Sequence, residues 1–168
     1  NRVWILLSAG SLSIFYIIVS KLIPGVRGGA HFAVEYFSVF GDTLPEVIRT
    51  AVLNPIFTIS QVLNPPNISY LITIFAPVGF LSLAYPIFLI FAGPDLAINL
   101  LSNNENLRDV TFHYGAVIIP FLYISAIYGA RTLLKLKLNF LTTRTIIIIL
   151  LFSSIYSTYQ LGALPGSR

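Results

Sequence analysis

The residues most able to do chemistry are polar side chains that interrupt a long apolar run near the middle of the chain. Residues 68–102 contain one charged residue, Asp95, and Asn99 and Ser102 follow it four and then three residues later. This spacing predicts a polar stripe along one helix face, from mid-membrane to the outer helix end. A carboxylate at membrane depth is costly unless it is paired or wet, so a functional role is its default interpretation. A protonated, hydrogen-bonded Asp95 fits the sequence equally well.

Further candidate groups follow that stripe. Arg108 could donate charge-assisted hydrogen bonds to an anion, although it could also pair in water with its acidic neighbours and contribute little. His113 and Tyr114 are expected in the first outer turn of the next helix, where a histidine can bind an anion or move a proton. A lone histidine at a helix end is more often a plain hydrogen-bonding residue. Arg49 is a third cationic candidate, in an earlier segment.

Several kinds of site are disfavoured. The chain has no cysteine and two histidines, His31 and His113, and its carboxylates lack metal-ligand spacing, so we expect no metal site. No glycine-rich phosphate loop or nucleophile elbow is present. Basic residues cluster from Arg131 onward, a pattern more typical of a membrane topology signal than of a nucleic-acid patch. We therefore expect neither a cofactor nor a nucleic-acid partner.

Composition indicates a membrane protein. Apolar residues make up 56% of the 168 residues and charged residues 10%, and mean hydropathy is +0.85. Soluble domains carry about 25% charged residues. The start at Asn1 inside an apolar run, with no methionine anywhere, indicates a fragment of a longer chain.

Hydropathy predicts an all-α fold, a polytopic transmembrane helical bundle of about five crossings. A spanning helix needs roughly 20 apolar residues, and about 17 suffice where the bilayer is thin. Residues 68–102 are too long for one crossing, and Pro86 favours the first turn of a new helix over a helix interior, so we expect a helical hairpin. The expected crossings are residues 3–23, 68–84, 86–101, 110–130 and 145–160.

Basic residues predict the orientation of a single transmembrane domain, residues 1–168. A short loop, residues 131–144, carries several basic residues and no acidic one, and the positive-inside rule makes it cytoplasmic. Counting back places residues 24–67 outside as an extracytoplasmic helical loop. If residues 68–102 crossed only once, residues 24–67 would lie inside, which is the rival topology. The basic residues of the cytoplasmic loop are Arg131, Lys135, Lys137 and Arg144.

Short amphipathic helices are expected in the outer loop. Thr43 and Glu46 have the spacing of a capping box, which satisfies amides at a helix start. Asn54 and Pro55 end that helix and begin another. These helices could lie in the membrane interface or form a lid without chemistry, which is the favoured alternative. Asn67 matches a glycosylation acceptor but is expected to cap the following helix instead. The apolar face of the first helix comprises positions 44, 47, 48, 51 and 52.

The order of several short motifs resembles a family of predicted bacterial and archaeal membrane proteins, domain-of-unknown-function family 2079. The resemblance covers roughly residues 29–130, and the order of the motifs carries it. The motifs are Phe40-Gly-Asp-Thr-Leu-Pro-Glu46, Asn54-Pro55, Pro77-Val-Gly-Phe80 leading into Tyr85-Pro86, Asn99-Leu-Leu-Ser102, and His113-Tyr114 with Ile118-Ile-Pro-Phe121.

The resemblance implies a location in a bacterial or archaeal plasma membrane and a likeness to GT-C type integral-membrane glycosyltransferases. Such enzymes take a sugar from a polyprenyl-phosphate carrier at the outer face and use an acidic residue in an early outer loop. The resemblance further implies that this chain is a C-terminal part, with that loop before Asn1. Asp95 departs from the family pattern, in which a small apolar residue follows Pro94, so the resemblance adds nothing to its functional interpretation.

Three functions remain open. In a GT-C-like glycosyltransferase, Arg108, His113 and Arg49 would face the phosphate of a polyprenyl-phosphate sugar. In a transporter or flippase-like protein, Asp95, Asn99 and Ser102 would form a solute or proton path. In a structural membrane subunit, none of these residues would do chemistry. In every case the lipid bilayer is a partner.

Overall fold

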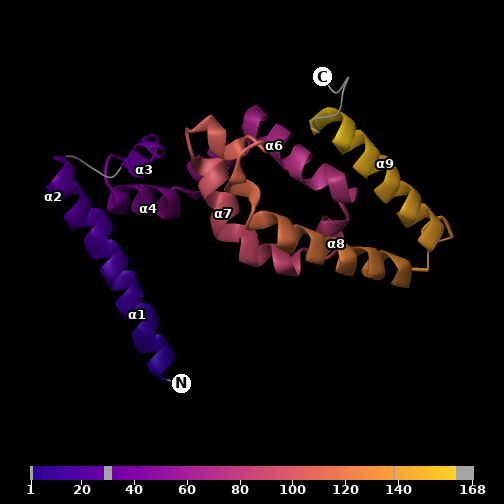
Figure 1. Cartoon of the computed structure of the whole chain (residues 1–168), viewed down its shortest axis with the longest axis horizontal. Helices are drawn as coiled ribbons and strands as arrows, with labels where there is room; N and C mark the ends of the chain where they lie inside the picture. The colour runs from indigo at the N-terminus through magenta and orange to yellow at the C-terminus, as the bar shows by residue number, and fades with distance from the viewer. Residues whose placement is uncertain (1, 29–31, 138, 162–168) are drawn as a thin grey trace. The chain divides into compact units, whose positions relative to one another are not determined.

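The computed structural model describes residues 2–28, 32–137 and 139–161, and His31 lies outside these ranges. Within the described ranges the chain forms helices, turns and loops without any strand, which confirms the all-α class (Figure 1). The chain divides into two compact units, Asn1–Ile59 and Ser60–Arg168. Each unit is described by itself.

The first unit begins with a long helix made of three pieces. α1 (Arg2–Ile17) continues as a π turn, η1 (Ile18–Leu22), and then as α2 (Ile23–Arg27). Pro24 lacks an N–H group and its ring crowds the carbonyl one turn earlier, which explains a widened turn just before it. The helix therefore runs past the predicted end at residue 23, and Gly28 stops it with a left-handed φ of 75°.

Three short helices follow: α3 (Phe32–Glu35), α4 (Leu44–Leu53) and α5 (Pro55–Val62). The last two of them, α4 and α5, form as predicted. The capping box is confirmed: the Thr43 hydroxyl accepts from the Glu46 amide at 3.4 Å, and the Glu46 carboxylate accepts from the Thr43 amide at 3.2 Å. Asn54 separates α4 from α5, also as predicted. Neither α4 nor α5 contains a fully buried residue.

In the segment predicted as a helical hairpin, the structure confirms the new helix start at Pro86 but not a continuous first arm. α6 (Pro65–Phe75) passes into 3₁₀ turns, η2 (Ala76–Val78) and η3 (Leu81–Ala84). The amide of Phe80 bonds to the Phe75 carbonyl at 3.2 Å and that of Gly79 to the Ala76 carbonyl at 2.9 Å. These two bonds make a Schellman motif with Gly79 at φ 58°, which ends a helix. A single helix over residues 68–84 was therefore wrong.

The second arm agrees with its prediction. After Tyr85, η4 (Pro86–Phe88) leads into α7 (Leu89–Leu101), so the proline does start a new helix. The following turns, η5 (Glu105–Arg108) and η6 (His113–Gly115), connect α7 to the last two helices.

Both C-terminal helices differ from prediction at their ends. α8 (Ile118–Lys135) begins later than residue 110, because the Asp109 carboxylate accepts from the amide and hydroxyl of Thr111 at 2.9 and 2.8 Å and closes a local turn. Arg131 and Lys135 are good helix formers and extend α8, so the basic loop is shorter than residues 131–144. α9 (Thr143–Leu161) matches its predicted position closely.

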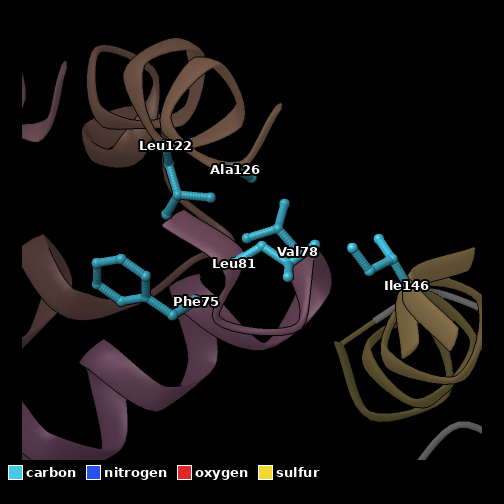
Figure 2. Close-up of a cluster of buried hydrophobic side chains, with 6 residues drawn as sticks. All are labelled: Phe75, Val78, Leu81, Leu122, Ala126 and Ile146. Carbon is cyan, nitrogen blue, oxygen red and sulfur yellow. The ribbon is translucent and has the colours of Figure 1, made fainter. Parts of the chain in front are cut away.

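The core of the second unit forms around the 3₁₀ segment, residues 76–84. η3 packs on α8 and η2 packs on α9. At Gly129 a Cβ would overlap the Leu81 carbonyl oxygen, so glycine is required for the approach of α8 to η3. Figure 2 shows the buried side chains that converge here: Phe75, Val78, Leu81, Leu122, Ala126 and Ile146.

The number of membrane crossings is not established by these helices. Among the described residues, Arg2–Val26 alone is both long and apolar enough to cross a membrane, and Pro86–Leu101 is apolar but shorter. The five-crossing topology therefore stays a prediction.

Candidate functional site

A hydrogen-bonded network surrounds the C-terminal end of α7. Asn99 is 2% exposed, and its Nδ2 donates to the Tyr70 hydroxyl at 2.9 Å and to the Tyr114 carbonyl at 3.5 Å. Tyr70 belongs to α6 and Tyr114 to η6. One buried amide therefore joins three elements that are distant in sequence.

Arg108 is part of this network and caps the helix. Its Nη1 donates to the carbonyls of Ser102 at 2.6 Å and Asn99 at 3.3 Å. The last carbonyls of a helix have no partner within the helix, and a cation there also offsets the negative end of the helix dipole. Two hydrogen bonds therefore hold the Arg108 side chain against α7. This differs from the alternative in which Arg108 only pairs in water with its acidic neighbours.

Asn67 makes the third contact with the same helix end. Its side chain is fully buried, and Nδ2 donates to the carbonyls of Leu100 at 2.6 Å and Gln61 at 2.9 Å. The expectation that Asn67 caps α6 was wrong. Asn64 is the cap, accepting from the Asn67 amide at 2.9 Å, because Pro65 and Pro66 occupy the first helical positions and have no N–H to offer.

The predicted polar stripe is divided by this network. Ser102 is 4% exposed, and its hydroxyl accepts from the Asn104 amide at 3.0 Å. The Asn99 side-chain amide donates to the Tyr70 hydroxyl and the Tyr114 carbonyl, as described above. Asp95 lies one turn earlier on α7, half-buried, and makes no hydrogen bond or ion pair with any other described residue. The stripe is therefore a helix-end network with a separate carboxyl group before it.

The remaining candidates are more exposed. His113 is exposed and its ring lies 4.6 Å from that of Tyr114, centroid to centroid. Arg49 is exposed on α4, in the first unit, whereas the network belongs to the second unit. Among the described residues no three histidine, cysteine, aspartate or glutamate side chains gather into a possible metal site.

An open hollow of about 450 Å³ lies beside the network. α6 contributes hydroxyl groups to one wall, η5 contributes Arg108 and the Glu105 carboxylate, and the next residue, Asp109, contributes a second carboxylate. The cation is thus partly offset by two anions, and a ligand would meet a mixed polar surface. A smaller, apolar hollow of about 150 Å³ is bordered by Tyr70 and His113. The residues that line the larger hollow are Pro66, Ser69, Tyr70, Thr73, Glu105, Asn106, Arg108 and Asp109.

Comparison with known proteins places the chain in a family. The family model described as "Predicted membrane protein (DUF2079)" matches residues 1–163. The chain belongs to this family. No curated protein and no solved structure matches it.

Membership makes this chain a membrane protein, so lipid contact explains its exposed apolar surface. α1 buries no residue, and its Trp4 and Leu6 side chains are 67% and 72% exposed. In water such a helix would be an aggregation hazard, whereas in a bilayer these side chains face lipid.

Sequence reasoning missed Tyr70 of this membrane protein's network and gave Asn67 a different role, that of a helix cap. Both interrupt the start of an apolar run, three residues apart, and therefore share one helix face. That spacing is a usable signal for a buried polar contact. It does not identify the partners, Asn99 and Leu100, because these come from a helix about thirty residues later.

Proposed function

We propose that this membrane protein binds the phosphate of a lipid-linked sugar carrier, as part of GT-C-like glycosyl transfer from a polyprenyl-phosphate sugar at the outer membrane face. The observation that carries the proposal is the position of Arg108, which lines the 450 Å³ hollow while two helix-end carbonyls hold its side chain. We assign no catalytic residue in this chain.

The capping bonds favour a second use of the same guanidinium. A guanidinium has five N–H donors, and both capping bonds use Nη1. The groups on Nε and Nη2 have no hydrogen-bond partner among the described residues and could donate to phosphate oxygens. Because the side chain is already ordered, binding would cost little additional side-chain entropy.

Two features oppose anion binding and make the proposal testable. Glu105 and Asp109 line the same hollow and would repel a phosphate. Removing the charge of Glu105 should therefore strengthen binding of a phosphate, whereas it would not affect a purely structural role of Arg108.

A transport path receives less support. Asn99 and Ser102 are buried and hydrogen-bonded, so of the three residues proposed to line a path only Asp95 has a side chain without such a partner among the described residues.

The test compares binding of polyprenyl monophosphate with that of polyprenol, which has the same chain and no phosphate, to the protein in nanodiscs. Arg108→Lys keeps the positive charge and Arg108→Gln removes it, while both disturb the cap. A charge-assisted hydrogen bond contributes about 1.5–3 kcal/mol, so Arg108→Gln should weaken phosphate binding by roughly tenfold or more. Arg108→Lys should retain most of it, and Glu105→Gln should strengthen it.

Arg49→Gln is the matched control, since it removes one exposed arginine charge from α4. Equal binding of polyprenyl monophosphate and polyprenol would refute the proposal. So would equal losses in Arg108→Gln and Arg49→Gln, because the effect would then be nonspecific electrostatics.

A further inference from the structure

A second groove, of about 600 Å³ and lined by both apolar and uncharged polar side chains, lies between α6 and α9 in the second unit. Its polar side chains are hydroxyls and one amide, and none of its lining residues carries a charge. The apolar part of the lining is concentrated on α6. The lining residues are Pro65, Ile68, Ser69, Ile72, Thr73, Ala76, Tyr156, Ser157 and Gln160.

Ser157 supplies independent evidence for a ligand. It lines the groove, is 7% exposed, and its Oγ has no hydrogen-bond partner among the described residues. Buried hydroxyl groups are nearly always hydrogen-bonded, since an unpaired one loses its water without compensation. A hydroxyl-bearing ligand in the groove would supply that missing partner once the Ser157 side chain turns its Oγ, which is buried in the ligand-free structure, toward the groove.

The opposite wall presents matching groups. Ser69 and Thr73 are one helical turn apart on α6, so both hydroxyls lie on the same helix face. Hydroxyl and amide side chains each donate and accept hydrogen bonds. Ile68 and Ile72 lie on the adjoining part of that face and offer an apolar surface to a hydrocarbon chain.

We propose that this groove binds an amphiphile with an uncharged, polyhydroxylated head, of the kind found in glycolipids, with its hydrocarbon chain along α6. An uncharged lining gives a charged head no partner, whereas hydroxyls of both helices can exchange hydrogen bonds with a sugar-like head. Ser69 and Thr73 line both this groove and the hollow beside Arg108, but the inference does not rest on the proposed phosphate site, because its ligand carries no phosphate and does not need Arg108.

The test uses the whole protein in nanodiscs and an alkyl glucoside with a diazirine in its chain. The comparison ligand is an alkyl dimethylamine oxide with the same chain, which keeps the apolar part and removes the hydroxyls. Crosslinks of the glucoside should map to α6 and α9, and excess alkyl glucoside should compete while free glucose competes poorly. If the glucoside binds but free glucose displaces it better than the alkyl glucoside does, the assignment of an amphiphile is overturned.

Matched variants measure the hydroxyl contribution. Thr73→Val and Ser157→Ala should each weaken glucoside binding about three- to tenfold and leave amine oxide binding unchanged. Thr158→Val makes the same substitution as Thr73→Val at an exposed position of α9 outside the groove, and should change neither. Ser157→Ala should also raise the thermal stability of the ligand-free protein slightly, because it removes a buried hydroxyl that has no hydrogen-bond partner among the described residues.

Three results would overturn the inference: equal binding of the two head groups, crosslinks outside α6 and α9, or equal losses in Thr73→Val and Thr158→Val. Arg108→Gln should not affect glucoside binding. A failure here is therefore distinguishable from a failure of the phosphate proposal.

Discussion

Replacing Gly129 by alanine should strongly destabilise the second unit. The new Cβ would overlap the Leu81 carbonyl oxygen, and it would lie 2.9 Å from the Leu81 carbonyl carbon and 3.4 Å from the Ala84 Cβ. Because the first two neighbours are backbone atoms of η3, α8 must move away from the core. Overpacking of this kind costs about 1–3 kcal/mol, and backbone contact places Gly129→Ala at or above the upper value.

The assay is thermal unfolding of the purified protein in one detergent, followed by intrinsic fluorescence. A loss of about 3 kcal/mol corresponds to a Tm roughly 6–12 °C lower for a chain of this size. Gly10→Ala is the control, because a Cβ at Gly10 meets nothing within 4 Å and alanine favours helix. A Gly129→Ala protein as stable as the wild type would refute the close approach of α8 and η3.

Two further predictions concern the α7 network and the topology. Asn67→Asp should lower the free energy of unfolding by about 2–4 kcal/mol, since it removes a buried donor from two carbonyls. The control, Asn139→Asp at an exposed position, should change it by no more than about 0.5 kcal/mol. Thermal unfolding of both variants measures the difference, and equal stability would contradict the network. Single cysteines at Ser38 and Asn106 should both react with an impermeant thiol reagent added outside, and one at Asn139 should not. Opposite labelling of Ser38 and Asn106 would establish the rival topology with one crossing over residues 68–102.

Features governed by neighbouring residues were predictable from the sequence. The capping box needs only Thr43 and Glu46, and the start of a helix after Tyr85 needs only Pro86, so both were predicted correctly. The helix break at Gly79 was also present locally, in the sequence from Pro77 to Phe80. The hydropathy of residues 68–84 does not reveal this break, because one glycine in an apolar segment closes the Schellman motif without lowering the hydropathy of its surroundings.

Features that depend on distant partners were not predictable. The sequence marks Arg108 and Asn99 as polar candidates near a helix end. It cannot show that the Arg108 guanidinium bonds to the Asn99 and Ser102 carbonyls, because that depends on how η5 folds back against α7. The same limit applies to Ser157 and Thr73, which line one groove from helices at opposite ends of the second unit's sequence.

The 3₁₀ segment at residues 76–84 has a consequence for how the protein is made. In hydrocarbon, backbone without regular helical hydrogen bonds is tolerated only where protein surrounds it. Here that surrounding protein is α8 and α9, with the Leu122 carbonyl of α8 accepting from the Ser82 hydroxyl at 3.1 Å. The ribosome synthesises both helices after residues 76–84. If residues 76–84 lie within the bilayer, as the five-crossing topology predicts, we expect this segment to wait at the insertion machinery and to enter the bilayer together with α8 and α9.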